Sequence, residues 1–101
     1  MGLVGEQFQF CLFVVGEHER SQRAIRQAQA LCRQLPEGCS YHLRIVNVLQ
    51  DPDLAESYKV LATPTLLRLT PLPPRRVVGD LADSERVLWM LDVLQAPPRI
   101  M

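Results

Sequence analysis

The chain has 101 residues, of which 48% are hydrophobic and 22% are charged, and its eleven basic and eleven acidic residues leave no net charge. We expect one domain over 1–101 with an ordered core at about 8–95, because this length suits a single domain and the apolar fraction is too high for a disordered chain. No apolar run approaches the roughly 20 residues of a membrane span, and the N-terminus lacks the basic segment of a secretory signal, so we expect a cytoplasmic protein without a membrane anchor. The absence of a basic excess argues against nucleic-acid binding.

The first half of the chain predicts a βαβ unit. Residues 8–15 form an apolar run, rich in aromatic and β-branched side chains, that ends at Gly16 and is typical of a buried strand. Apolar residues then recur every three or four positions over 19–35, which predicts a helix that Pro36 ends. Alternation over 41–49 predicts a second strand. Because a helix joins the two strands, we expect them to pair in parallel with a right-handed crossover.

The second half predicts shorter elements. Asp51-Pro52 is typical of a helix start, with Asp51 as the N-cap. Residues 65–69 and 75–78 predict two strands of a hairpin, joined by a proline-rich turn at 71–74. The pair Thr63-Pro64 directly precedes the first of these strands, where thioredoxin-like proteins usually have a cis-proline that faces the active-site end. An ordinary proline leading into a strand fits the sequence equally well.

The last segment before the prolines at 97–98 has no clear period. Seven of the nine residues in 86–94 are apolar, so a buried helix and a buried strand both fit. The acidic capping residues at 83–85 favour a helix. Such a helix leaves Trp89 and Met90 on its outer face as an apolar patch, which indicates a partner or an oligomer. With a helix here the predicted order is β-α-β-α-β-β-α, an α/β chain with the order of the thioredoxin fold.

The three cysteines lack the spacing of a thiol enzyme. Thiol–disulfide chemistry needs a thiolate of low pKa, usually the first cysteine of C-x-x-C at the start of the first helix, and the junction at 16–21 contains no cysteine. Cys11 and Cys32 occupy apolar positions and are predicted to be buried, whereas Cys39 is predicted to lie exposed in a loop. A Cys32–Cys39 disulfide is disfavoured in a cytoplasmic protein.

Other catalytic or cofactor sites are not indicated. His18 and His42 lie far apart in the sequence, so no metal site is expected, and the five glycines form no phosphate-binding loop. Ser21, His18 and Asp51 have obvious capping or surface roles and do not suggest a nucleophile with its base. We therefore expect a binding module with no catalytic residue and no cofactor.

The arginines are the remaining polar feature. They fall on the predicted first helix (Arg20, Arg23, Arg26 and Arg33) and on the predicted hairpin (Arg68, Arg75 and Arg76). A solvated face explains them, and so does a recognition surface for carboxylates on another protein. Aspartates at 51, 53, 80 and 83 form separate acidic patches that suit self-association.

Several motifs together resemble the KaiB family of circadian-clock proteins over about residues 8–95. They are D-P-D-L-A-E at 51–56, L-A-T-P-T-L at 61–66, P-L-P at 71–73, R-R-x-x-G-D-L at 75–81 and V-L…L-D at 87–92. The resemblance implies a non-enzymatic clock component that binds a KaiC-type ATPase after its phosphorylation. It also implies that the complex sequesters a KaiA-like activator and displaces a sensor histidine kinase.

The resemblance further implies two folds for one chain. The family has a thioredoxin-like form and a resting form, β-α-β-β-α-α-β, that assembles into a homo-oligomer, a dimer or a tetramer. By position, Arg23, Arg68, Arg75 and Arg76 match basic residues of the family's binding surfaces. These four residues are the predicted partner-binding site.

The predicted hinge of this switch consists of Pro64, Pro71, Pro73, Met90 and Asp92, with the prolines as isomerisation points of a slow transition. The family commonly has Ile-Gly-Leu-Asp where this chain has Trp-Met-Leu-Asp at 89–92. Exchanging Gly for Met raises helix propensity by several tenths of a kcal/mol, up to about 1 kcal/mol. We therefore expect this chain to favour the thioredoxin-like form.

A second departure is the charged segment Glu-His-Glu-Arg at 17–20, where the family is usually less charged. It suggests a divergent paralogue with a non-standard partner. The alternative functions are a sensor domain detached from a clock-output histidine kinase, which shares the fold and stays in it, and a thiol oxidoreductase. The motifs at 71–73 and 75–81 favour the KaiB family over the sensor domain.

Overall fold

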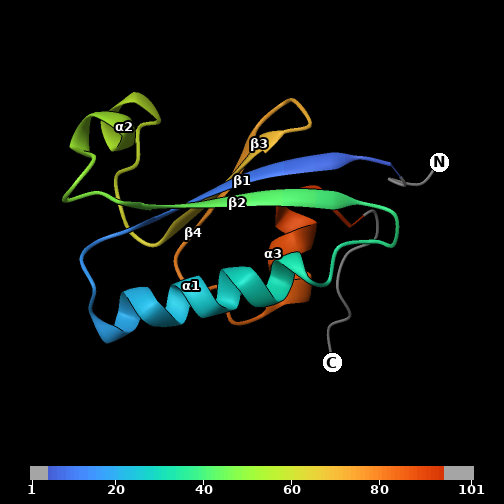
Figure 1. Cartoon of the computed structure of the whole chain (residues 1–101), viewed down its shortest axis with the longest axis horizontal. Coiled ribbons are helices and arrows are strands. Elements are labelled where there is room, and N and C mark those ends of the chain that lie inside the picture. The colour runs from blue at the N-terminus through green and yellow to red at the C-terminus, as the bar shows by residue number, and fades with distance from the viewer. Residues whose placement is uncertain (1–4, 95–101) are drawn as a thin grey trace.

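The computed structural model describes residues 5–94 and contains seven elements. In chain order they are strand β1 (Gln7–Val14), helix α1 (Glu19–Cys32), strand β2 (Ser40–Asn47), helix α2 (Pro52–Ser57), strand β3 (Thr65–Thr70), strand β4 (Arg75–Val78) and helix α3 (Ser84–Met90) (Figure 1). The predicted thioredoxin-like order is confirmed. The predicted proline stop at 97–98 and the tail after it lie outside the described residues.

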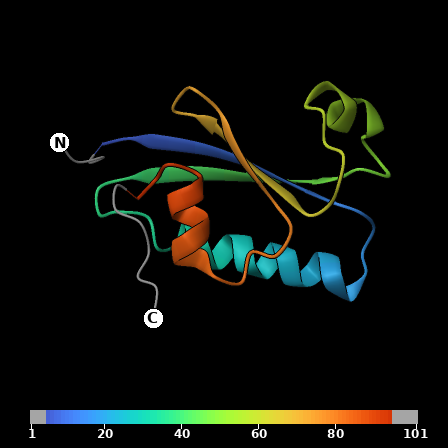
Figure 2. The same ribbon diagram turned by 180° about the vertical axis from the view of Figure 1, so that it is seen from behind.

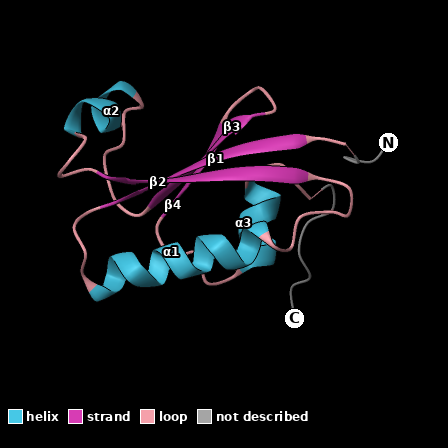
Figure 3. Cartoon of the chain, viewed as in Figure 1, coloured by secondary structure: helices cyan, strands magenta, loops and turns pink. Residues whose placement is uncertain are grey.

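One mixed four-stranded sheet organises the molecule (Figure 3). Its strand order is β2-β1-β3-β4, with β1 and β2 parallel along their whole length and the other two pairs antiparallel. The predicted parallel βαβ unit is therefore confirmed. Figures 1 and 2 show α1 and α3 side by side on one face of the sheet and α2 on the other.

The residues of β1 alternate between two cores. Phe8, Phe10 and Leu12, each at most 1% exposed, face α1 and α3 in the larger core. Cys11 and Phe13 face the opposite side, where a smaller core includes Ala55 of α2. A strand that is buried on both faces reads as a nearly continuous apolar run, which is why the sequence predicted β1 so clearly.

Two predicted helix ends are wrong. Helix α1 ends at Cys32 rather than at residue 35, because the chain leaves the helix through a capping turn at Arg33. Helix α3 ends at Met90, well before the prolines. Asp92 has a left-handed φ of 60°, and this turn brings Val93, 1% exposed, back onto the core. Burial of apolar side chains after the turn explains why the helix stops there.

The two predicted N-caps behave differently. Asp83 precedes α3, and its Oδ1 accepts a hydrogen bond of 3.2 Å from the backbone N–H of Arg86. Asp51 precedes α2 and occupies the N-cap position, but its side chain makes no capping hydrogen bond. None of the helices within residues 5–94 has the length and apolar character needed to cross a lipid bilayer.

Candidate partner-binding site

The junction between β1 and α1 is held by short polar contacts. Gly16 has a φ of 67°, and its N–H donates to Oδ1 of Asn47 at 3.0 Å, which ties the ends of β1 and β2 together. Ser21, 4% exposed, donates from its hydroxyl to the Val15 carbonyl at 2.7 Å. The left-handed φ favours glycine at this position, and a Cβ on Gly16 would stand 3.2 Å from the ring of the exposed His18, which would have to shift.

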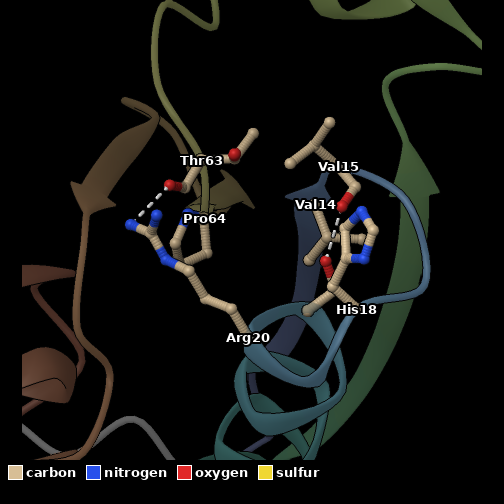
Figure 4. A pocket seen from close by; sticks show the side chains of 7 residues that line it. Val14, Val15, His18, Arg20, Thr63 and Pro64 are labelled. Atoms are coloured by element: carbon tan, nitrogen blue, oxygen red, sulfur yellow. Dashed lines mark hydrogen bonds between the residues drawn. The ribbon is translucent and has the colours of Figure 1, made fainter.

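A pocket of about 290 Å³ opens between this junction and the segment before β3; we call it the Pro64 pocket (Figure 4). The Thr63-Pro64 peptide bond is cis, as thioredoxin-like proteins would have it. Nη2 of Arg20 donates to the Thr63 carbonyl at 3.1 Å and so joins α1 to the opposite wall. The lining residues are Val14, Val15, His18, Arg20, Ser21, Thr63 and Pro64.

No cysteine lines the Pro64 pocket. Cys11 and Cys32 are each 2% exposed, which confirms that they are buried. Burial raises the pKa of the Cys11 thiol and raises the pKa of the Cys32 thiol to about 11, outweighing the opposing effects of nearby arginines. Both thiols are therefore protonated near neutral pH and are poor nucleophiles.

Cys39 was predicted to be exposed, but the structure shows it half-buried and packed against the larger core. The three cysteines form no disulfide. Within residues 5–94, no group of three histidine, cysteine or acidic side chains is placed to hold a metal ion.

A second pocket, of about 350 Å³, adjoins the Pro64 pocket through the residues that both share, Arg20 and Pro64. Arg23 and Gln27 of α1 form one side of it, and Asp80 forms part of the other. The Asp80 carboxylate accepts a hydrogen bond of 3.0 Å from the backbone N–H of Ala82. This arrangement places Arg23, one of the predicted partner-binding residues, on an exposed surface next to the Pro64 pocket.

Arg68 does not lie on the surface. It is 3% exposed, and its guanidinium donates to the carbonyls of Pro71 and Pro73 in the β3–β4 turn. Its Nε has no hydrogen-bond partner among the described residues, and burial lowers the pKa of its guanidinium despite the opposing charge of Asp92. The surface position expected for Arg68 is therefore wrong, because hydrogen bonds to two turn carbonyls hold its side chain inside the molecule.

Arg75 and Arg76 are exposed on β4 and belong to a different site from Arg23. Arg76 donates to the carbonyls of Tyr58 at 2.5 Å and Lys59 at 3.1 Å, so it connects β4 to the end of α2. Both arginines line a groove of about 500 Å³ whose apolar residues are Leu67, Leu69, Leu72 and Pro74. This groove and the two pockets beside Arg20 have no lining residue in common.

The predicted hinge residues lie in two places. Pro64, Pro71 and Pro73 each follow a cis peptide bond, at the entry to β3 and in the turn after it. Met90 is the last residue of α3, and Asp92 forms the left-handed turn that follows. Trp89 and Met90 are each 43% exposed, as expected for the outer face of this helix.

The family model described as the KaiB domain matches residues 11–93 of the chain. Relatives include the circadian clock oscillator protein KaiB of Nostoc punctiforme, 46% identical over 82% of this chain and 79% of the relative. KaiB of Synechococcus elongatus is 45% identical over 82% of this chain and 80% of the relative. KaiB1 of Synechocystis is 43% identical over 82% of this chain and 78% of the relative. The chain belongs to the KaiB family. The family resemblance expected from the motifs is confirmed.

Solved structures agree with the fold of this KaiB-family chain. The N-terminal domain of Synechococcus elongatus SasA aligns with a TM-score of 0.72 and 22% identity over 92% of this chain and 90% of that domain. The thioredoxin Deadhead of Drosophila melanogaster aligns with a TM-score of 0.61 and 21% identity over 85% of this chain and 79% of the thioredoxin. These similarities show the thioredoxin-like fold.

Sequence reasoning did not predict the Pro64 pocket. It gave His18, Arg20 and Ser21 capping or surface roles; His18 does occupy the N-cap of α1 and Arg20 is exposed, but the pocket that all three line was not foreseen. Two signals in the sequence pointed there: the proline before β3, which faces this junction in thioredoxin-like proteins, and the charged segment at 17–20.

Proposed function

We propose that this KaiB-family protein is a non-enzymatic, cytoplasmic timing component that binds a KaiC-type ATPase and regulates its phosphorylation cycle. The observation that carries the proposal is the KaiB match over residues 11–93, together with about 45% identity to circadian clock oscillator proteins. The thioredoxin-like fold without a thiol in the Pro64 pocket is consistent with a binding role. A KaiA-like protein, a sensor histidine kinase and further copies of the chain are the other proposed partners.

The proposed contact residues are Arg23, Arg75 and Arg76, which are exposed and carry guanidinium groups suited to carboxylates on a partner. Arg68 has a different proposed role in this fold. It holds the turn between β3 and β4, so it positions Arg75 and Arg76 and does not itself contact the partner.

The test is to mix the chain with the KaiC-type ATPase of its own organism, unmodified and with phosphomimetic substitutions, and to measure complex formation by size-exclusion chromatography. We expect a co-eluting complex with the phosphomimetic form. Arg23→Ala and Arg75→Ala should weaken it, whereas Arg33→Ala, an exposed arginine at the end of α1, should not. Absence of a complex with every form of the ATPase would overturn the proposal.

We also propose that the segment after β4 exchanges between this helix and a strand in a second fold. Helix α3 has only seven residues, and its last residue, Met90, stands where the family commonly has glycine. In NMR spectra of the isolated chain, Met90→Gly should raise the population of the second fold, because glycine lowers helix propensity by up to about 1 kcal/mol. A wild-type chain whose residues 86–94 form a strand would contradict the expected preference.

The similarity to the SasA N-terminal domain, at a TM-score of 0.72, favours a second candidate: a detached sensor domain that keeps one fold. Such a domain should bind the ATPase and show one set of NMR signals in both wild type and Met90→Gly. A thiol oxidoreductase is the remaining alternative. Insulin reduction that Cys39→Ser abolishes would establish it and would contradict the non-enzymatic role.

A further inference from the structure

The Pro64 pocket combines apolar walls with a cationic rim. Val14, Val15 and Pro64 provide the walls, and Figure 4 shows Arg20 beside Pro64 and His18 beside Val15. The volume of about 290 Å³ lies at the lower limit of ligand pockets, which typically have roughly 300–1,000 Å³. The pocket therefore suits one compact apolar group, such as a branched aliphatic chain or a phenyl ring, and is too small for a longer peptide segment.

The guanidinium of Arg20 is anchored at the pocket, and no acidic side chain among residues 5–94 forms an ion pair with it. One N–H of its guanidinium donates to the Thr63 carbonyl at 3.1 Å, which anchors the side chain at the pocket. A guanidinium has five N–H donors, and no other acceptor for Arg20 is found among residues 5–94. Its neighbour Glu19 is engaged by Arg26 in an ion pair of 3.1 Å.

The adjoining pocket adds one charge of each sign, so the charge of Arg20 remains in excess at this rim. Arg23 lies there with Arg20, and the acidic residue opposite, Asp80, accepts a hydrogen bond from the Ala82 backbone. The acidic residues at 17 and 19 line neither pocket. A ligand that enters the Pro64 pocket thus meets an apolar interior and an excess of positive charge at its opening.

We propose that the Pro64 pocket binds a small carboxylic acid whose apolar part has the size of an isobutyl or phenyl group. The apolar part lies between Val14, Val15 and Pro64, and the carboxylate accepts hydrogen bonds from Arg20 at the rim. Arginine is suited to this task because its planar guanidinium pairs with a carboxylate through two parallel N–H bonds. This site goes beyond the proposed clock function and does not depend on it.

The test is an NMR titration of the full ¹⁵N-labelled chain with phenylacetate and with 4-methylpentanoate. We expect saturable shifts of amide signals confined to residues 14–21 and 62–65. Acetate lacks the apolar group and phenylacetamide lacks the charge, so each should bind at least about tenfold more weakly than phenylacetate.

Arg20→Gln should weaken phenylacetate binding about tenfold or more, because it replaces charge-assisted hydrogen bonds with neutral ones. Arg33→Gln, at the exposed C-cap of the same helix, is the matched control and should leave the affinity unchanged. Circular dichroism of both variants checks that the fold is intact.

The proposal would be overturned by the absence of a saturable shift with either acid, by equal binding of phenylacetamide, or by unchanged affinity in folded Arg20→Gln. An N-acetylated peptide with a C-terminal phenylalanine distinguishes the source of the carboxylate. If it binds more than about tenfold tighter than phenylacetate, the pocket recognises a protein chain end, and the assignment to a small acid is wrong.

Discussion

The two halves of the chain contribute to one fold in different ways. Elements β1, α1 and β2 have eight, fourteen and eight residues, and β1 and β2 pair along their whole length. Up to residue 94, where the described part of the chain ends, no later element exceeds seven residues, and β4 has four. Single side chains add to the strand pairing and the buried apolar residues of the second half: Arg68 binds the β3–β4 turn, Arg76 joins β4 to α2, and Asp83 caps α3.

This difference teaches that the repeated apolar patterns of β1 and α1 specify the first half, whereas the short elements of the second half combine buried apolar residues with individual polar contacts. A long element repeats its apolar pattern many times and buries a large area, so no single polar group decides its position. A short element has too few apolar positions for that. Its ends are therefore fixed in addition by hydrogen bonds, such as those of Arg68 and Asp83.

The largest effect is expected from truncation of the first-half core. Leu31 of α1 is 0% exposed in the larger core, so Leu31→Ala should lower the free energy of unfolding by about 2–5 kcal/mol through lost burial and a cavity. Leu49 is 68% exposed, so Leu49→Ala should change the free energy of unfolding by less than about 0.5 kcal/mol. Urea denaturation measures both. A cost below about 1 kcal/mol for Leu31→Ala would show that α1 is not the main support of the core.

The next largest effect on stability is expected from substitution of Arg68, which lies in the second half of the chain. Arg68→Met keeps much of the side-chain volume but leaves the Pro71 and Pro73 carbonyls without their donor, which should cost about 1–3 kcal/mol. Arg68→Lys should retain part of this stability, because an ammonium lacks the planar fork of a guanidinium. Hydrogen exchange should increase in β3 and β4 and change little in β1 and β2. Equal increases of hydrogen exchange in all four strands would show that Arg68 does not stabilise the second half selectively.

Alkaline pH should lower the stability of the protein through groups in the first half of the chain, which contains all three cysteines. The folded chain keeps the Cys32 proton up to about pH 11, whereas an unfolded thiol loses it near its ordinary pKa of 9.0. Stability should therefore fall as pH rises from 9 to 11, by up to about 1.4 kcal/mol per pH unit for this thiol. Urea denaturation at several pH values measures the slope, and Cys32→Ala should reduce it. An unchanged slope in Cys32→Ala would show that other groups cause the loss.

The smallest effect is expected at the helix caps. Asp83→Ala should cost about 1 kcal/mol, because the Asp83 side chain accepts from the Arg86 N–H, and Asp83→Asn should be nearly neutral. Asp51→Ala should cost less, since Asp51 makes no capping hydrogen bond. Thermal unfolding compares the three variants. A larger loss for Asp51→Ala than for Asp83→Ala would contradict the structure of these caps.

The same division explains how much of the fold could be predicted. The apolar pattern of residues 8–15 and 19–35 predicted β1, α1 and the parallel pairing with β2, because each pattern extends over most of its element. The end of α3 could not be predicted. The turn at Asp92 forms because Leu91 and Val93 are both buried, and burial on each side of a turn is set by distant parts of the chain.

The site was predicted less completely for a related reason. The sequence identified Arg68, Arg75 and Arg76 as one basic group, but neighbouring residues of a strand point to opposite faces of the sheet, so Arg75 and Arg76 face different sides. Arg68 shares a face with its pairing partner Arg75, yet it is buried because its guanidinium donates to the carbonyls of the β3–β4 turn. The Pro64 pocket joins residues about 43 positions apart, as the Arg20–Thr63 hydrogen bond shows, and no local pattern reports such a contact.

Gly16 has a consequence for how this pocket can evolve. Its φ of 67° favours glycine at the base of the junction, whichever residue stands at position 18. His18 and Arg20, which stand at the rim, are exposed and carry no core packing. Substitutions at these two positions should therefore change the chemistry of the rim while the scaffold beneath it stays constant, although replacing Arg20 removes its hydrogen bond to the Thr63 carbonyl.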